Sequence, residues 1–435
     1  LLPSVLYALK NNKRVVVSTN TINLQEQLLT KDIPAMVEAL AGVDGVPIEQ
    51  FKFTQLKGRA NYLCLKRFSH LRSSENFSVD EARLLSKTLV WLRDTETGDR
   101  SELNLGNRRS AAPWDRLSAQ GAQDCMGVKG ACFLKAARDR AAASHLVIVN
   151  HALLISDIVS GGTLIPDHDI LIVDEARHLE SEATRHLGFE LAQGRLNDHL
   201  QILVGDHGLL KRASLSLRGS SAGESRRAAF EEVASRVFTQ TPKLRDTTTE
   251  LFADIGKILK FQAGPLTASR DMRITSATRG QPAWSQLEIK WENVDLLLAE
   301  ILKEIQALST ALDGLEHAGL LGYEELVPEV LNLLQVTTEL RKQLTEFIPQ
   351  PEPDQIYWGS RFDRSGDLVL HGAPLHVGEQ LKEQLFERKE SVILTSATLS
   401  TGGTFDHVTE RIGFSDNDEL LLGSPFDYPN AALIC

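Results

Sequence analysis

Four short hydrophobic runs, each passing directly into polar residues, constrain the fold of this 435-residue chain more than any other feature. In chain order they read RVVVS (Arg14–Ser18), LVIVN (Leu146–Asn150), ILIVD (Ile170–Asp174) and VILT (Val392–Thr395). Runs this short and this rich in β-branched residues are typical of strands that are buried on both faces. Helical sequence lies between them, so the pattern predicts an α/β fold with a parallel sheet.

The composition fits a folded chain of several domains. Hydrophobic residues make up 42 %, which provides enough apolar surface for real cores, and the length predicts about three domains. No apolar run reaches the ~18 residues that span a bilayer, and the first ten residues lack the features of a signal peptide. We therefore expect a soluble, cytoplasmic protein with no membrane partner.

Between the third and fourth runs lie more than two hundred residues of mainly helical character. Apolar residues recur there at alternating spacings of four and three, which is the pattern of a packed helix seam. We expect an inserted helical domain that contains an antiparallel hairpin, and a strand near 356–358 that returns the chain to the parallel sheet. The two seams are formed by Leu287, Trp291, Val294, Leu298, Ile301, Ile305, Leu308, Leu312 and Leu315, and by Leu326, Val330, Leu333, Thr337, Leu340, Leu344 and Phe347.

The charge is distributed unevenly. The whole chain carries a net charge of −11, yet residues 57–140 hold 16 Lys and Arg against 10 Asp and Glu, a net charge of +6. Clustered basic residues favour binding to a phosphate backbone. On charge alone, a solvated Arg-rich face explains the segment equally well.

Two adjacent acids end the third run. Asp174 and Glu175 would lie at the carboxyl edge of a parallel sheet, where α/β proteins bind ligands. This is the Walker B arrangement, in which Asp174 would hold Mg²⁺ and Glu175 would polarise the water that attacks the γ-phosphate of ATP. Acids at the start of a helix offer the alternative reading of this pair.

A second polar loop follows the fourth run. Ser396 and Thr398 of SATL would lie at the same sheet edge and could link a nucleotide site to a neighbouring domain by hydrogen bonds. A structural Ser/Thr turn would look similar. The combination favours a site, because four polar loops, which begin at Ser18, Asn150, Asp174 and Ser396, converge on one edge.

Seven motifs together resemble the bacterial DinG/YoaA helicases, which are superfamily 2 relatives of the eukaryotic XPD helicase. The resemblance runs from end to end in matching order. It implies a RecA-like motor domain that is interrupted by an iron-sulfur domain and a helical Arch domain and is followed by a second RecA-like domain. The motifs are TNTINLQEQL (19–28), KGRANYLC (57–64), VNHALL (149–154), VDEA (173–176), APLHV (373–377), LTSATLS (394–400) and SPFDY (424–428).

The resemblance also implies an activity. In this family ATP hydrolysis drives 5′ to 3′ translocation on single-stranded DNA and unwinds duplexes, forks, D-loops or R-loops in DNA repair and replication, usually by a monomer. The implied domains are 1–56 (first part of motor domain 1), 57–140 (basic iron-sulfur-type insertion), 141–188 (motor domain 1), 189–350 (Arch domain), 351–404 (return to motor domain 1) and 405–435 (start of motor domain 2).

Parts of the family pattern are missing or altered. The chain contains no Walker A string, G-x-x-x-x-G-K-[ST], and stops soon after SPFDY, so we expect an internal fragment that does not hydrolyse ATP alone. The family's DEAH box here reads DEAR. Because Arg177 cannot accept hydrogen bonds and stays charged, it puts the coupling role of the usual His in doubt, while Asp174 and Glu175 keep theirs.

The cysteines also depart from the pattern. The resemblance assigns Cys64, Cys125 and Cys132 to a [4Fe-4S] cluster, which needs four thiolates, and no fourth ligand is evident. Cys435 lies in a different predicted domain. A cluster with an unusual fourth position and a degenerate site with structural thiols both remain open.

The expected DNA contacts come from the loops nearest the basic segment. Tyr62 could stack on a base, although a tyrosine in a loop is more often a packing residue, and His151 could equally be a core histidine. The candidates are Thr19, Asn20, Thr21, Gln25, Lys57, Arg59, Asn61, Tyr62, Asn150 and His151.

Two other functions compete with the helicase. Arg177 and the missing cysteine favour a degenerate, non-catalytic DNA-binding or scaffold protein. Some members of the family carry a nuclease domain or lack a cluster, which would keep the protein an enzyme but change its task.

Overall fold

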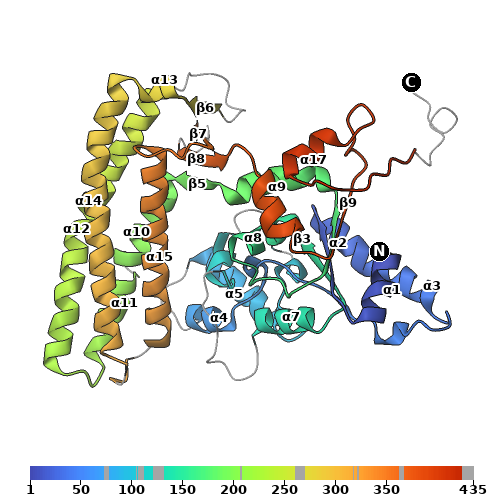
Figure 1. Cartoon of the computed structure of the whole chain (residues 1–435). Helices are drawn as coiled ribbons and strands as arrows, with labels where there is room; N and C mark the ends of the chain where they lie inside the picture. The colour runs from blue at the N-terminus through green and yellow to red at the C-terminus, as the bar shows by residue number, and fades with distance from the viewer. Residues whose placement is uncertain are drawn as a thin grey trace, which may run out of the picture. The chain divides into compact units, whose positions relative to one another are not determined.

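The computed structural model describes residues 1–72, 78–103, 105, 112–120, 132–205, 208–259, 270–316, 318–320, 323–361 and 367–423. The chain forms two compact units, whose elements are labelled in Figure 1. Unit 1 comprises Leu1–Leu187 and His376–Cys435, and unit 2 comprises Gly188–Leu375. Unit 2 is therefore an insertion in the sequence of unit 1.

Unit 1 is built on a five-stranded parallel sheet with the strand order β2-β3-β1-β4-β9. Four of its strands are those predicted from the hydrophobic runs, so the α/β class with a parallel sheet is confirmed. The short edge strand β2 was not predicted. The strands are β1 (Val15–Thr19), β2 (Phe53–Gln55), β3 (Leu146–Asn150), β4 (Ile170–Asp174) and β9 (Ser391–Thr395).

Alternate residues of the central strands enter two different cores, because successive side chains of a strand point to opposite faces. Val16, Val147 and Val173 belong to one buried cluster, and Val17 and Ile148 belong to the other. Helices pack on both faces, which explains why these strands are apolar throughout. The helices of unit 1 are α1 (Leu2–Asn11), α2 (Ile22–Gln27), α3 (Ile33–Leu40), α4 (Leu65–Arg72), α5 (Val79–Trp91), α7 (Phe133–Ala142), α8 (His151–Val159), α9 (Leu179–Leu187), α16 (Gly378–Leu381) and α17 (Asp406–Ile412).

The described part of the basic segment has a small core of its own. Trp114 is fully buried there, and its indole N–H donates to the carbonyl of Ala60 at 2.7 Å. Helix α5 begins with a capping box, in which the Ser78 hydroxyl accepts from the backbone of Glu81 and the Glu81 carboxylate accepts from the backbone of Ser78. This core fixes the loop that follows β2.

Unit 2 contains long helices that pack along their lengths. All the predicted seam residues are buried, which confirms both seams, and α14 and α15 contact each other. Arg279, just before α14, donates to the carbonyl oxygen of Ile348, just after α15, and Asp295, near the middle of α14, pairs with Arg341 of α15. The two helices are therefore antiparallel, as predicted. The helices are α10 (Gln193–Val204), α11 (Leu209–Arg218), α12 (Glu224–Ile258), α13 (Ser276–Arg279), α14 (Pro282–Asp313) and α15 (Tyr323–Phe347).

Unit 2 also holds a four-stranded antiparallel sheet that sequence reasoning missed. The strand expected near 356–358 exists as β7, but it pairs with β6 and β8 and does not return the chain to the parallel sheet. The reason is packing, because Tyr357, Leu368 and Leu370 are buried in the core of the helices. The strands are β5 (Phe189–Ala192), β6 (Arg270–Ile274), β7 (Gln355–Arg361) and β8 (Leu368–Pro374), and their order is β5-β8-β7-β6.

The exit from the insertion therefore differs from expectation. Residues 351–375, which we expected in motor domain 1, are part of unit 2, and unit 1 resumes at His376. None of the helices in the described ranges is long and apolar enough to cross a bilayer.

Candidate active site at the carboxyl edge of the parallel sheet

The register of the sheet brings four polar strand ends to the same level. Thr19 is paired with Asn150 across β1 and β3, and Asp174 is paired with Thr395 across β4 and β9. Ser18 is paired with Val173, which connects these two pairs through the centre of the sheet. Since neighbouring strands lie roughly 4.8 Å apart, the loops after β1, β3, β4 and β9 share one edge, as predicted.

Glu175 occupies the first position of the loop after β4 in a left-handed backbone conformation, with φ of 55°. Such a conformation is uncommon for a residue other than glycine, and it tends to be retained where function requires it. The Glu175 carboxylate accepts a hydrogen bond from the Ser396 hydroxyl at 3.1 Å. The turn thus directs this acid towards the loop after β9.

Arg177 forms a second connection between the same two loops. Its Nε lies 3.1 Å from the Glu175 carboxylate, and its Nη1 donates to the Thr398 hydroxyl at 3.1 Å. The guanidinium carries five N–H donors that point in several directions, so one side chain can contact both loops, whereas a neutral histidine has a single N–H donor. Of the three predicted coupling residues, Ser396 and Arg177 contact Glu175, and Thr398 joins them through Arg177.

Asp174 differs from its neighbour because it forms no ion pair with any residue in the described ranges. Burial raises the pKa of its carboxyl group, and the charge of Glu175 raises it further. A half-buried carboxylate at a strand end is a suitable ligand for a hard cation such as Mg²⁺, which would also offset the repulsion from Glu175. The residues present thus fit a magnesium site.

The loops after β1 and β3 are joined by a buried hydrogen bond. The Ser18 hydroxyl lies 2.7 Å from Nδ1 of His151, whose side chain is 1 % exposed. Burial lowers the pKa of His151 to about 4, so the ring is neutral at pH 7. Its Nε2 has no hydrogen-bond partner among the described residues. Sequence reasoning noted the Ser18 loop but missed this pair, whose only signal was the convergence of strand ends.

Two other candidates from these loops cap helices. The Thr21 hydroxyl accepts from the backbone N–H of Leu24 at the start of α2, and the Asn150 amide oxygen accepts from the backbone N–H of Leu153 at the start of α8. Caps of this kind are worth about 1 kcal/mol each. Helix capping alone therefore explains the threonine at position 21 and the asparagine at position 150.

The ten candidate residues for DNA contact fall into a buried group and a more accessible group. Tyr62 is 3 % exposed, its hydroxyl accepts from the backbone N–H of Lys57 at 3.0 Å, and burial raises its pKa to about 12. Lys57 is itself buried against Asp99, with its Nζ 2.6 Å from the carboxylate. Neither side chain is presented for stacking or for phosphate contact, because Tyr62 packs in the core on one face of the parallel sheet and Lys57 is held by Asp99. The buried candidates are Thr19, Gln25, Lys57, Tyr62 and His151, and the more accessible ones are Asn20, Thr21, Arg59, Asn61 and Asn150.

The cysteines do not complete a cluster site within the described ranges. Cys64 is buried just before α4, and Cys132 is the partly exposed residue before α7. Cys125 and Cys435 lie outside the described residues, as does the SPFDY motif. The described cysteines offer two of the four thiolates of a [4Fe-4S] cluster, and no group of three potential ligands is found in the same ranges. Two of the three predicted ligands are therefore described, and the cluster stays a prediction.

Comparison with known proteins tests the resemblance across the whole chain. The chain is 29 % identical to the 3'-5' exonuclease DinG of Bacillus subtilis over 98 % of its length. It is 28 % identical to the ATP-dependent DNA helicase YoaA of Haemophilus influenzae over 98 %, and 28 % identical to the ATP-dependent helicase DinG of Mycobacterium tuberculosis over its full length. The resemblance to the DinG/YoaA helicases is confirmed. The chain covers 45 %, 59 % and 60 % of these three relatives, so it spans roughly half of their length.

Other comparisons add little to this result. No family model matches the chain. A solved XPD helicase aligns with 95 % of this chain and 59 % of its own at 10 % identity, with a TM-score of 0.34. A similarity this weak supports no conclusion about this chain.

Proposed function

We propose that this chain provides part of the motor of an ATP-dependent DNA helicase that translocates 5′ to 3′ on single-stranded DNA. The observation that carries the proposal is the pair of links between the loops after β4 and β9, Glu175 with Ser396 and Arg177 with Thr398. The names of the YoaA and DinG relatives support DNA unwinding at the cost of ATP.

The proposed roles follow from the positions of the side chains. Asp174 would hold Mg²⁺, which neutralises charge on the phosphates of ATP when it is bound. Glu175 would orient and polarise the attacking water. Ser396, Thr398 and Arg177 would report the state of the nucleotide to the neighbouring motor domain, because they connect Glu175 to the loop that leads there.

The phosphate-binding part of the site has to come from outside these residues. No Walker A string is present in the 435 residues, and the relatives are longer than the chain. We therefore assign ATP turnover to a longer, full-length polypeptide and expect none from this chain alone.

The DNA would follow the accessible candidates of the basic segment and of the first loop. Arg59 and Asn61 lie in the segment with a net charge of +6, and Asn20 lies in the loop after β1. Clustered basic residues release counterions when they bind phosphates, so binding should weaken steeply with salt. We propose single-stranded, forked, D-loop or R-loop DNA as substrates in the cytoplasm, and a monomer as the acting species.

The [4Fe-4S] cluster stays a prediction that the resemblance implies. Its test is the iron content of the full-length protein after anaerobic purification. About four irons per chain would support it, and absence of iron would assign Cys64 and Cys132 to packing.

One observation favours the non-catalytic alternative. The guanidinium of Arg177 lies against the carboxylate that the helicase needs for its water, with Nε 3.1 Å from Oε2 of Glu175. If this contact persisted with nucleotide bound, Glu175 would be a poor base and the protein would bind DNA without turnover.

Unwinding assays on the full-length protein separate the two functions. Forked DNA with a 5′ single-stranded tail should be unwound in the presence of ATP, and the same duplex with only a 3′ tail should stay intact. Unwinding of the 3′-tailed duplex alone would reverse the proposed direction. Failure on both substrates, with salt-sensitive DNA binding retained, would support the scaffold.

A further inference from the structure

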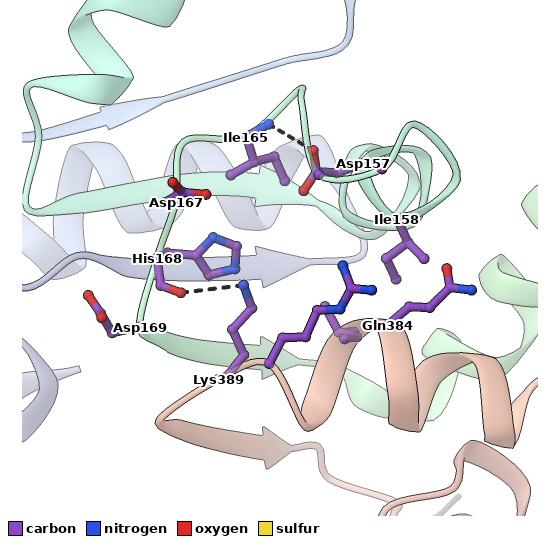
Figure 2. A pocket seen from close by; sticks show the side chains of 12 residues that line it. Asp157, Ile158, Ile165, Asp167, His168, Asp169, Gln384 and Lys389 are labelled. Carbon is purple, nitrogen blue, oxygen red and sulfur yellow. Dashed lines mark hydrogen bonds between the residues drawn. The ribbon is translucent and has the colours of Figure 1, made fainter.

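Unit 1 has a cavity of about 370 Å³ at the edge of the sheet opposite to the candidate active site. Its walls come from the end of α8, from the loop that leads into β4, and from the turn that precedes β9 (Figure 2). The strands β4 and β9 therefore run from this cavity to Glu175 and Ser396, a path of about 15 Å by the rise of a five-residue strand. The volume falls near the lower end of the range for small-molecule sites.

A buried histidine in the wall has an unused hydrogen-bonding atom. The His168 side chain is 8 % exposed, and its Nδ1 lies 3.1 Å from the carbonyl oxygen of Pro166. Since a carbonyl oxygen only accepts, Nδ1 carries the proton. Burial lowers the pKa of His168 to about 4, so the ring is neutral at pH 7 and its Nε2 is a bare acceptor. This Nε2 has no partner among the described residues, which is costly for a buried polar atom.

Two cations face the same space. Lys389 and Arg388 line the cavity, and neither forms an ion pair within the described part of the chain. The Lys389 ammonium donates to the carbonyl oxygen of His168 at 3.3 Å, and Figure 2 shows the end of its side chain facing the His168 ring. Burial lowers the pKa of Lys389, and the charges of Asp157 and Asp167 offset this effect only in part.

The acids of the wall are mostly occupied by other partners. The Asp157 carboxylate accepts the backbone N–H groups of Leu164 and Ile165 at 2.7 and 3.0 Å. Asp169 pairs with Lys13 at 2.8 Å. The third acid, Asp167, and the Gln384 amide also line the cavity, and both side chains are exposed. Beside them the cavity offers the buried acceptor of His168 and the two cations, which match a ligand with a hydrogen-bond donor beside an anionic group.

We propose that this cavity binds a small organic anion, a carboxylate or a phosphate monoester, that also carries a hydroxyl or amino group. Lys389 and Arg388 bind the anionic group, and Nε2 of His168 accepts the hydrogen bond from the ligand's O–H or N–H. The proposal is independent of the helicase function, because none of these residues belongs to the carboxyl edge of the sheet.

Matched pairs of ligands test the two halves of the site separately. The probes are glycerol 3-phosphate against propyl phosphate, and lactate against propionate, with inorganic phosphate as the bare anion, titrated into this chain by calorimetry at pH 7. We expect one hydroxylated probe to bind about tenfold more tightly than its partner without the hydroxyl, since the buried acceptor gains its bond. The pair that binds identifies the class of anion.

Variants of the wall localise the binding. His168→Phe should remove the preference for the hydroxyl and leave the affinity for propyl phosphate or propionate unchanged. Lys389→Met should weaken both members of the pair about tenfold. If Lys389→Met does not fold, Arg388→Met provides the same test, because the Arg388 side chain is exposed. The matched control is Lys382→Met, whose lysine lies in the preceding turn, pairs with Glu387 at 3.8 Å and does not line the cavity.

Two results would overturn the proposal. One is that none of the five probes binds with a dissociation constant below about 10 mM. The other is binding that is unaffected by His168→Phe, Lys389→Met and Arg388→Met, because the ligand would then occupy a different site.

Discussion

The two units use their polar side chains in different ways. In unit 2 the charged groups that join long helices form ion pairs. Nε and Nη2 of Arg341 donate to the Asp295 carboxylate at 2.6 and 2.8 Å, and Arg236 contacts Glu304 at 2.9 Å. At the carboxyl edge of unit 1, Glu175 receives two donors while the adjacent Asp174 forms no ion pair among the described residues.

This difference distinguishes polar groups that hold the fold together from polar groups that are available to bind a ligand. The two side chains of an ion pair between helices satisfy each other, so they offer no free group to a ligand. Such a pair contributes modestly to stability. An acid left without a counterion beside another acid is unfavourable unless something binds it, so it marks a site for a cation.

The largest difference is expected from the same substitution at the two kinds of glutamate. Glu175→Gln in the full-length protein should lower DNA-stimulated ATP turnover by about 100-fold or more, because an amide cannot act as the base for water. Glu304→Gln in unit 2 should change turnover less than twofold. Steady-state ATP hydrolysis with saturating single-stranded DNA measures both, and similar losses in the two variants would break the comparison.

Packing in unit 2 should have the next largest effect. Leu298 is fully buried in α14, whereas Leu296 in the same helix is 63 % exposed. Leu298→Ala should cost about 2–5 kcal/mol of the free energy of unfolding, and Leu296→Ala about 0.5 kcal/mol or less. Urea unfolding monitored by circular dichroism measures the difference. Equal costs would mean that the seam does not hold the unit together.

The acid sensitivity of unit 2 should depend on a buried histidine. Nε2 of His199 lies 2.8 Å from the Thr337 hydroxyl, and burial, aided by the charge of Arg195, lowers its pKa to about 4. Between pH 6.5 and 4 the unfolded chain binds a proton that the folded chain does not, so stability is fully present above pH 6.5 and is lost as the pH falls towards 4. The loss from pH 7 to pH 5 should be about 2 kcal/mol.

A neutral replacement checks the origin of this loss. His199→Gln keeps a side chain that can bond to Thr337 but does not titrate, so urea midpoints measured at pH 7 and pH 5 should move together much more closely than in the unaltered chain. An unchanged pH dependence in the variant would assign the acid sensitivity to other groups.

Within the candidate site, a smaller effect on turnover is expected at Arg177 than at Glu175. Its side chain is 44 % exposed, so its contact with Glu175 is worth about 1 kcal/mol or less. Arg177→Lys should change ATP turnover by no more than about fivefold. A lysine lacks the fork that joins Glu175 to Thr398, so the DNA unwound per ATP hydrolysed should fall. Arg341→Lys is the matched change in unit 2, and an equal yield of unwinding in both variants would remove Arg177 from coupling.

Much of the fold could be predicted because it depends on local patterns. The strands β1, β3 and β4 follow from runs of buried residues, and the seams of α14 and α15 follow from heptad spacing. The strand β9 was also found from its hydrophobic run, although its residues are exposed or only partly buried in the structure. The sheet of unit 2 could not be predicted in the same way. Its strand β5 pairs with β8 almost 180 residues later, and no local pattern encodes such a partner.

The candidate site shows the same limit. The meeting of Glu175 with Ser396 follows from parallel strand ends, which share one edge whatever their side chains. The link from Arg177 to Thr398 depends on the reach of one side chain across 221 residues of sequence. The burial of Tyr62 in the core of the parallel sheet and the pairing of Lys57 with Asp99 are tertiary contacts, which the charge count could not reveal.

The most direct test of the account is ATP hydrolysis by the full-length protein with and without single-stranded DNA. The account predicts that DNA stimulates turnover about tenfold or more, because the loops after β4 and β9 connect the acids of the site to the part of the protein that responds to DNA. Absence of turnover under both conditions, with DNA binding intact, would contradict it and leave a protein that binds DNA without a motor.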